Sequence, residues 1–103
     1  MSEFPEELAD CTGFQWDAGN SEKNLERHDV TQGEAEQVFF NRPVRVAAAN
    51  HIGREHRYAA LGQTSGGRLL TVVFTIRGSL IRPISVRDMS RRERRMYERQ
   101  EES

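Results

Sequence analysis

The sequence predicts an α+β protein in which a short N-terminal strand and two helices precede a four-stranded antiparallel sheet and a C-terminal helix. Two helix-start motifs, four runs of strand-forming residues between them, and glycine-containing turns between those runs predict this order. In such proteins the helices cover a sheet face. We therefore expect the helices on one face of the sheet and a partly open face on the other side.

The N-terminal half of the chain supplies the first strand and two helices. The apolar–polar–apolar pattern "FQW" at residues 14–16 predicts the short strand, and a first helix is expected over about residues 18–28. Thr31 and Glu34 have the spacing of a capping box, because each side chain can accept a hydrogen bond from the other residue's backbone amide. This box predicts a second helix over about residues 32–40.

Four strand-forming runs follow, beginning at Val44, His56, Arg68 and Leu80. The turn sequences "QTSGG" and "RGS" separate the last three runs and predict antiparallel hairpins. In "LLTVVFTI" both alternating faces are apolar enough for a central strand. Ser90 and Glu93 form another capping box, which predicts a helix over about residues 91–101. Tyr97 is expected to anchor that helix rather than to take part in catalysis.

Length and composition bound the class of protein. A chain of 103 residues with 36% hydrophobic and 30% charged residues predicts one small, polar domain, over residues 13–103, after a flexible acidic tail at residues 1–12. The single cysteine excludes an internal disulfide and a cysteine-rich metal site. No apolar run is long enough for a membrane helix, and the acidic start is unlike a signal peptide, so we expect a cytoplasmic protein.

The net charge of −1 hides an uneven distribution. Residues 1–36 carry a net charge of −8 and residues 37–103 a net charge of +7, and fourteen of the fifteen basic residues are arginine. The planar guanidinium group suits phosphate oxygens, so this distribution favours an anionic ligand for the C-terminal part. The alternative is a solvated basic surface. Arginines surround the predicted last helix, so no single ligand is expected to meet them all.

Five motifs, in this order and spacing, resemble the BrnT family, the toxins of a bacterial type II toxin–antitoxin pair. They are "FQWD" at residues 14–17, "KNLERHDV" at 23–30, "EAEQVF" at 34–39, "EHRYAALG" at 55–62 and "IRPISVRDMSRRERRMYE" at 81–98. The chain departs from the family pattern at Pro83, which stands where the family has a branched aliphatic residue. Proline donates no ladder hydrogen bond, so we expect that strand either to lie locally at a sheet edge or to have its amide side unpaired there.

The resemblance implies a RelE-like fold and an endoribonuclease that cleaves RNA without a metal or another cofactor. It also implies a partner, a BrnA-like antitoxin with a ribbon-helix-helix DNA-binding domain, in a heterotetramer of two toxins and two antitoxins. DNA would then be contacted only through the antitoxin, and no membrane contact is expected. A different class, a non-enzymatic basic module that binds nucleic acid or protein, remains the alternative. A metal hydrolase is disfavoured because no His, Asp and Glu residues have metal-ligand spacing.

Cleavage of RNA by its own 2′-hydroxyl needs a base, positive charge on the phosphate, and an acid for the departing oxygen. Glu55 and Arg57 are two apart in one strand, so they share a face and can place a base beside a phosphate clamp. The alternative is a cross-strand salt bridge.

Arg82 and Arg87 are candidate phosphate ligands, and Ser85 between them is a candidate supporting hydroxyl. Regular alternation puts Arg82 on the face of Val86 and opposite Arg87, so both arginines reach one phosphate only if a bulge intervenes or the strand ends early.

The resemblance makes His28 a candidate acid or base, although a cation at a helix C-terminus is equally well explained by the helix dipole. The remaining candidates contact the RNA backbone in this interpretation. They are Lys23, Asn24, Arg91 and Arg95.

Overall fold

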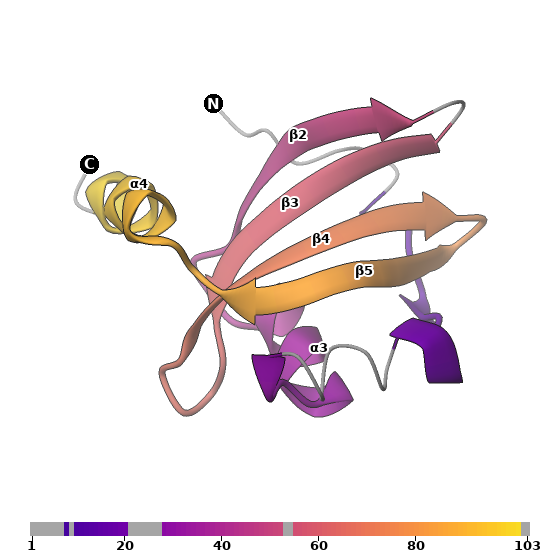
Figure 1. Cartoon of the computed structure of the whole chain (residues 1–103), viewed down its shortest axis with the longest axis horizontal. Coiled ribbons are helices and arrows are strands. Elements are labelled where there is room, and N and C mark those ends of the chain that lie inside the picture. Colours follow the sequence, from indigo (N-terminus) through magenta and orange to yellow (C-terminus); the bar gives the residue numbers. More distant parts are fainter. Residues whose placement is uncertain (1–7, 9, 21–27, 53–54, 102–103) are drawn as a thin grey trace.

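The computed structural model describes Leu8 and residues 10–20, 28–52 and 55–101. These residues form one sheet of five strands in the order β1-β5-β4-β3-β2, with helices against it (Figure 1). The strands are β1 (Gly13–Phe14), β2 (Arg45–Ile52), β3 (Glu55–Gln63), β4 (Leu69–Arg77) and β5 (Leu80–Asp88), and the helices with full bounds are α3 (Gln32–Phe40) and α4 (Arg91–Glu101).

The sheet is larger than predicted and mixed. β2 to β5 form the expected antiparallel meander, and β4 is the middle strand of the five-stranded sheet. β1 adds a fifth strand that runs parallel to β5, with Gly13 opposite Leu80 and Phe14 opposite Ile81. The prediction of a purely four-stranded antiparallel sheet was therefore wrong, because a two-residue strand has no pattern that names its partner.

Both capping boxes start helices as predicted. The hydroxyl of Thr31 accepts a hydrogen bond from the amide of Glu34, whose carboxylate accepts one from the amide of Thr31. Ser90 and Glu93 make the same reciprocal pair at the start of α4. Of the first predicted helix, residues 18–20 and His28 are helical, and residues 21–27 lie outside the described part of the chain.

The main core lies between α3 and one face of the sheet. Leu70, Val72 and Phe74 of β4 alternate onto this core face, and none of the three is exposed. Gly62 of β3 allows close contact with α3, because a Cβ atom there would lie 2.8 Å from Cγ1 of Val38. Any side chain at this position would push the helix away from the sheet.

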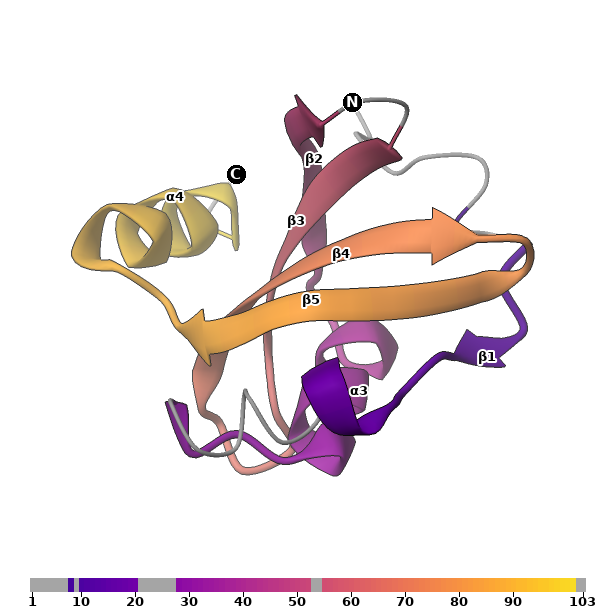
Figure 2. The ribbon, with the colours of Figure 1, turned by 45° about the vertical axis from the view of Figure 1, so that its right-hand side comes forward.

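Helix α4 lies on the other face, which corrects the expectation that all helices cover one face. Figure 2 shows α3 and α4 on opposite sides of β4 and β5. Tyr97 is 1% exposed and packs with Leu61, Leu69 and Met89, and its hydroxyl donates to the carbonyl of Pro43 at 2.7 Å. Tyr97 therefore anchors α4, as expected. α4 covers only the end of this face nearest the start of β4.

The described residues of the N-terminal segment contact the domain. Leu8 is buried in the main core, and the amide of Thr12 donates to the carbonyl of Ser79 at 2.8 Å. Residues 1–7 lie outside the described chain, so a flexible acidic tail there stays a prediction. No helix among the described residues is long and apolar enough to span a membrane.

Candidate functional site

A bulge in β5 decides where its arginines point. Val73 of β4 pairs with Ser85, but the next residue, Phe74, pairs with Pro83, so Ile84 is an extra residue in β5. Beyond the bulge Thr75 pairs with Arg82, and before it Thr71 pairs with Arg87. Directly opposite residues share a face of an antiparallel pair, so the bulge puts both arginines on one face.

Arg82, Ser85 and Arg87 therefore point to the side of the sheet opposite the core. Ile81, Pro83 and Val86 are buried on the core face instead. The expectation that Arg82 shares a face with Val86 was wrong, because regular alternation does not hold across a bulge. The condition stated for a joint role of Arg82 and Arg87, an intervening bulge, is met.

Arg57 joins this face from β3. Its neighbour Tyr58 stacks on Phe74 in the core, so alternation turns Arg57 to the opposite side. Thr75 then lies between Arg57 and Arg82, and its hydroxyl donates to the carbonyl of His56 at 2.9 Å. We call the surface that carries Arg57, Thr75, Arg82, Ser85 and Arg87 the arginine face.

Asp17 and Asn20 brace the end of the arginine face at Arg82. Oδ2 of Asp17 accepts from Nη1 of Arg82 at 2.9 Å, and the Arg82 side chain is 19% exposed. Asn20 is buried, and its Nδ2 donates to the carbonyl of Pro83 at 2.9 Å. The amide of Asp17 donates to Oδ1 of Asn20, and the amide of Asn20 donates to Oδ1 of Asp17. The second of these bonds, followed by the bond from Arg82, holds the pKa of Asp17 below its usual value. The brace thus fixes both the bulge and its arginine.

Glu93 of α4 forms a salt bridge with Arg87 at the other end of the arginine face. Its two carboxylate oxygens accept from Nη1 and Nη2 of Arg87 at 2.7 and 2.9 Å, a bidentate pair. The same carboxylate accepts from the hydroxyl of Thr71 at 2.9 Å and from the amide of Ser90 at 2.8 Å. Glu93 thereby connects the start of α4 to β4 and β5.

These contacts fix the ionisation state of Glu93. The Arg87 guanidinium, with smaller contributions from Ser90 and Thr71, lowers the pKa of Glu93 from 4.5 to about 2. The carboxylate in turn raises the pKa of Arg87. A carboxylate with so low a pKa is a poor proton acceptor near neutral pH, so Glu93 is suited to hold α4 rather than to act as a general base.

His28 lies at the Arg87 end of the sheet. Nη2 of Arg68 donates to the carbonyl of His28, and Arg68 also pairs with Asp88 at the end of β5. After Arg68, the charge of His28 is among the causes that lower the pKa of Asp88. Thr71 and Thr75 are four residues apart on β4, about 13 Å. The structure therefore does not bring His28 together with Arg57 and Arg82.

The other predicted site residues are spread over the chain. Glu55 begins β3 opposite Ile52, two residues from Arg57, and its side chain lies outside what the structure describes. Lys23 and Asn24 lie in the part of the chain that is not described. Ser85 is half-buried on the arginine face, whereas Arg91 and Arg95 are exposed on α4.

Sequence reasoning missed the partners of the two central arginines. Asp17 is 65 residues from Arg82 and Asn20 is 63 from Pro83, so no local pattern joins them. Glu93 was recognised only as a helix cap, and its pairing with Arg87 depends on which sheet face α4 covers. Among the described residues, no group of three His, Cys, Asp or Glu side chains is arranged to hold a metal ion.

Comparisons with known proteins identify the family. Residues 16–93 match the model of the family described as "Ribonuclease toxin, BrnT, of type II toxin-antitoxin system". The crystal structure of the Brucella abortus ribonuclease toxin BrnT is similar in fold, with a TM-score of 0.58 and 21% sequence identity, and the match covers 78% of this chain and 99% of that chain. No curated protein matches significantly. The family match spans both Asp17 and Glu93, and the chain belongs to the BrnT family of ribonuclease toxins of type II toxin–antitoxin systems.

Proposed function

We propose that this chain is a metal-independent endoribonuclease toxin whose RNA substrate binds on the arginine face. The observation that carries the proposal is the β5 bulge, which turns Arg82, Ser85 and Arg87 to the side of Arg57. Arg57 and Arg82 flank Thr75 and offer fixed positive charge for the scissile phosphate. Charge placed in advance where a transition state becomes more negative is a large contribution to catalysis.

The proposed reaction uses the RNA's own 2′-hydroxyl. This oxygen attacks the adjacent phosphorus, the bond to the 5′-oxygen breaks, and the products end in a 2′,3′-cyclic phosphate and a 5′-hydroxyl. Glu55, two residues from Arg57 on β3, is the proposed base, and His28, Lys23 and Asn24 remain proposed participants. Arg87 is available to a phosphate only if Glu93 shares or releases it, because its guanidinium is now paired.

Family membership implies an antitoxin partner. We propose a BrnA-like antitoxin with a ribbon-helix-helix domain, bound as two toxins and two antitoxins, with DNA contacted through the antitoxin alone. Cleavage of RNA would then inhibit translation until the antitoxin binds. The RelE-like relationship of the fold and action in the cytoplasm rest on the same family resemblance.

A second candidate is a non-enzymatic basic module. It is favoured by the pairing of both β5 arginines with carboxylates, Arg82 with Asp17 and Arg87 with Glu93, while the arginines of α4 are exposed. Incubation of the purified protein with end-labelled RNA in a chelator separates the two. The toxin proposal predicts cleavage with cyclic-phosphate ends, whereas intact RNA, or cleavage that returns only with a divalent metal, would refute metal-independent catalysis.

A further inference from the structure

Four arginines of α4 share one side of the helix. At 3.6 residues per turn, Arg91, Arg92, Arg95 and Arg99 fall within an arc of about 100°. All four are exposed, and we call them the arginine stripe. The expectation that the arginines surround the helix was therefore too broad, since only Arg94 lies well outside this arc.

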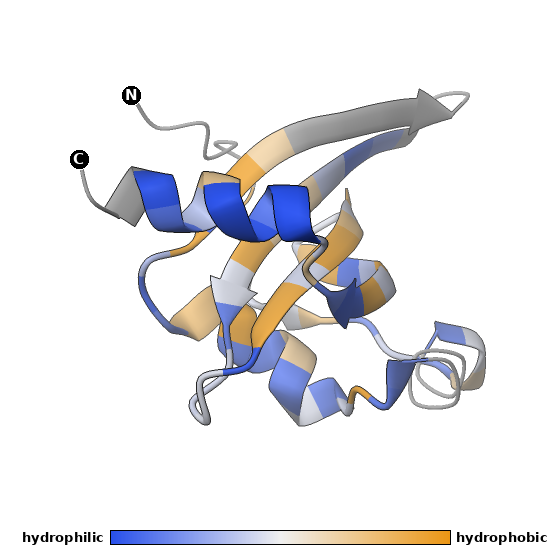
Figure 3. Cartoon of the chain, turned by 60° about the vertical axis from the view of Figure 1, so that its left-hand side comes forward, coloured by the Kyte–Doolittle hydropathy of each residue, from blue (hydrophilic) through white to orange (hydrophobic). Residues whose placement is uncertain are grey.

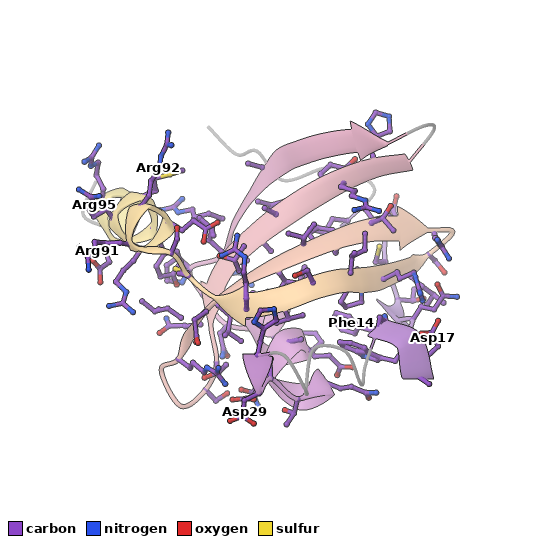
Figure 4. All side chains as sticks on the ribbon, viewed as in Figure 1. Phe14, Asp17, Asp29, Arg91, Arg92 and Arg95 are labelled. Carbon is purple, nitrogen blue, oxygen red and sulfur yellow. The ribbon has the colours of Figure 1, made fainter. Side chains whose placement is uncertain are left out.

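The stripe points away from the sheet. Glu93 and Tyr97, which attach α4 to β4, β5 and Pro43, lie on the opposite side of the helix. Figure 4 shows Arg91 and Arg95 on the side of α4 away from the strands and Arg92 extending upward from the helix. The contacts of Glu93 and Tyr97 thus fix the direction in which the stripe points, and its guanidinium groups are exposed to solvent.

The chemistry of the stripe fits a polyanion better than a protein surface. Met96, 46% exposed, and Glu98 lie at its two edges, and the stripe itself contains neither an apolar side chain nor a carboxylate. Figure 3 shows α4 as the most continuous hydrophilic segment of that view. Protein interfaces have an apolar centre depleted in charge, whereas nucleic-acid interfaces are polar and strongly positive.

The stripe is also connected to the proposed site. Glu93, in the first turn of α4, contacts Arg87 of the arginine face and the neighbouring Thr71, so the helix begins where that face ends. A single RNA strand bound on the face can continue over the N-terminal turn of α4. A partner that met the stripe alone would not need this continuity.

We propose that the arginine stripe binds the phosphate backbone of the single-stranded RNA that flanks the cleavage position. This inference rests on the proposed function, because it assigns the stripe to the same substrate. Contacts of this kind read no sequence, since guanidinium groups on phosphates fix position rather than base identity. The stripe therefore sets affinity and the preferred length of RNA.

The test is binding of a 2′-O-methyl RNA of about 20 nucleotides, measured by fluorescence anisotropy over a range of salt concentrations. This RNA lacks the internal nucleophile, so binding is measured without cleavage. The R95Q/R99Q variant is expected to bind about tenfold more weakly and to flatten the plot of log affinity against log salt by about 1.4, the value for two lost phosphate contacts. Circular dichroism checks that α4 remains folded.

The matched control is R42Q/R94Q, which removes the same charge from two exposed arginines that lie outside the stripe and outside the arginine face. It should bind like the wild type. Equal weakening by both variants, or wild-type binding by R95Q/R99Q, overturns the inference. Loss of the co-purifying antitoxin with RNA binding unchanged also overturns it and assigns the stripe to a protein partner. If R95Q/R99Q binds weakly but the wild type never cleaves unmodified RNA, the proposed function fails and the stripe is an RNA-binding surface with no cleavage position beside it.

Discussion

Arg82 and Arg87, an odd number of residues apart on β5, point to the same face of the sheet. Ile84 is the extra residue that makes this possible, and Asn20 holds the strand there by donating to the carbonyl of Pro83. A bulge re-aims side chains at a small cost in ladder hydrogen bonds. In this chain it converts two arginines on opposite faces into part of one basic surface.

Asn20 should matter for stability and for cleavage together. Asn20→Ala leaves the carbonyls of Gln15 and Pro83 without this donor, which should reduce the free energy of unfolding by about 2–3 kcal/mol. Cleavage should fall as well, because the bulge loses its brace. Urea denaturation and initial cleavage rates measure the two effects.

Asn20→Asp separates the hydrogen bond that the Asn20 side chain accepts from the two that it donates. It keeps an oxygen that can accept from the amide of Asp17 but cannot donate to Pro83. Cleavage should be as slow as in Asn20→Ala. A rate for Asn20→Asp close to that of the wild type would show that the bulge does not depend on this donor.

Glu93 should make stability depend on acid pH. Its pKa in the folded protein is lowered from 4.5 to about 2, so its stabilising effect is fully present above about pH 4.5 and is lost as the pH falls toward 2. Glu93→Gln should cost about 3 kcal/mol at neutral pH, the order of magnitude given by the size of this shift.

The measurement is the difference in unfolding free energy between wild type and Glu93→Gln as the pH is lowered. This difference should shrink through the window from 4.5 to about 2. Asp17 and Asp88 also have lowered pKa values, but their side chains are 53% and 63% exposed, so their contributions to stability are small. Both residues are present in the wild type and in the variant, so their contributions cancel in the difference. A difference that stays constant with pH would mean that Glu93 does not hold α4 through its charge.

Tyr97 should serve stability and not catalysis. Tyr97→Phe keeps the buried ring and removes the hydrogen bond to the carbonyl of Pro43, so the free energy of unfolding should fall by about 1 kcal/mol. The cleavage rate per folded molecule should remain that of the wild type. A variant of unchanged stability that no longer cleaves RNA would place the Tyr97 hydroxyl in the reaction.

Local patterns predicted the elements of this fold well. The boxes Thr31–Glu34 and Ser90–Glu93 marked where α3 and α4 begin, because both partners of each box lie within one helical turn. The alternating pattern of β4 gave a central strand for the same reason: the signal lies in neighbouring residues.

Long-range relationships were not predictable in the same way. The pairing of β1 with β5, the face covered by α4, and the partners Asp17 and Glu93 depend on contacts between distant segments. The bulge was foreseen only as a condition, since Pro83 marks an irregular strand but does not say where the extra residue lies. The arginines of the site could therefore be named from sequence, and their common face could not.

The most direct test of the central claim is the initial rate of RNA cleavage by Arg82→Ala in a chelator, compared with wild type and with Arg42→Ala as a matched surface control. Among the residues that the structure describes, Arg82 forms its salt bridge with the exposed Asp17, so its loss should change stability by less than about 1 kcal/mol. We predict a rate about 100-fold below wild type for Arg82→Ala and no change for Arg42→Ala. A wild-type rate for Arg82→Ala would contradict the assignment of RNA cleavage to the arginine face.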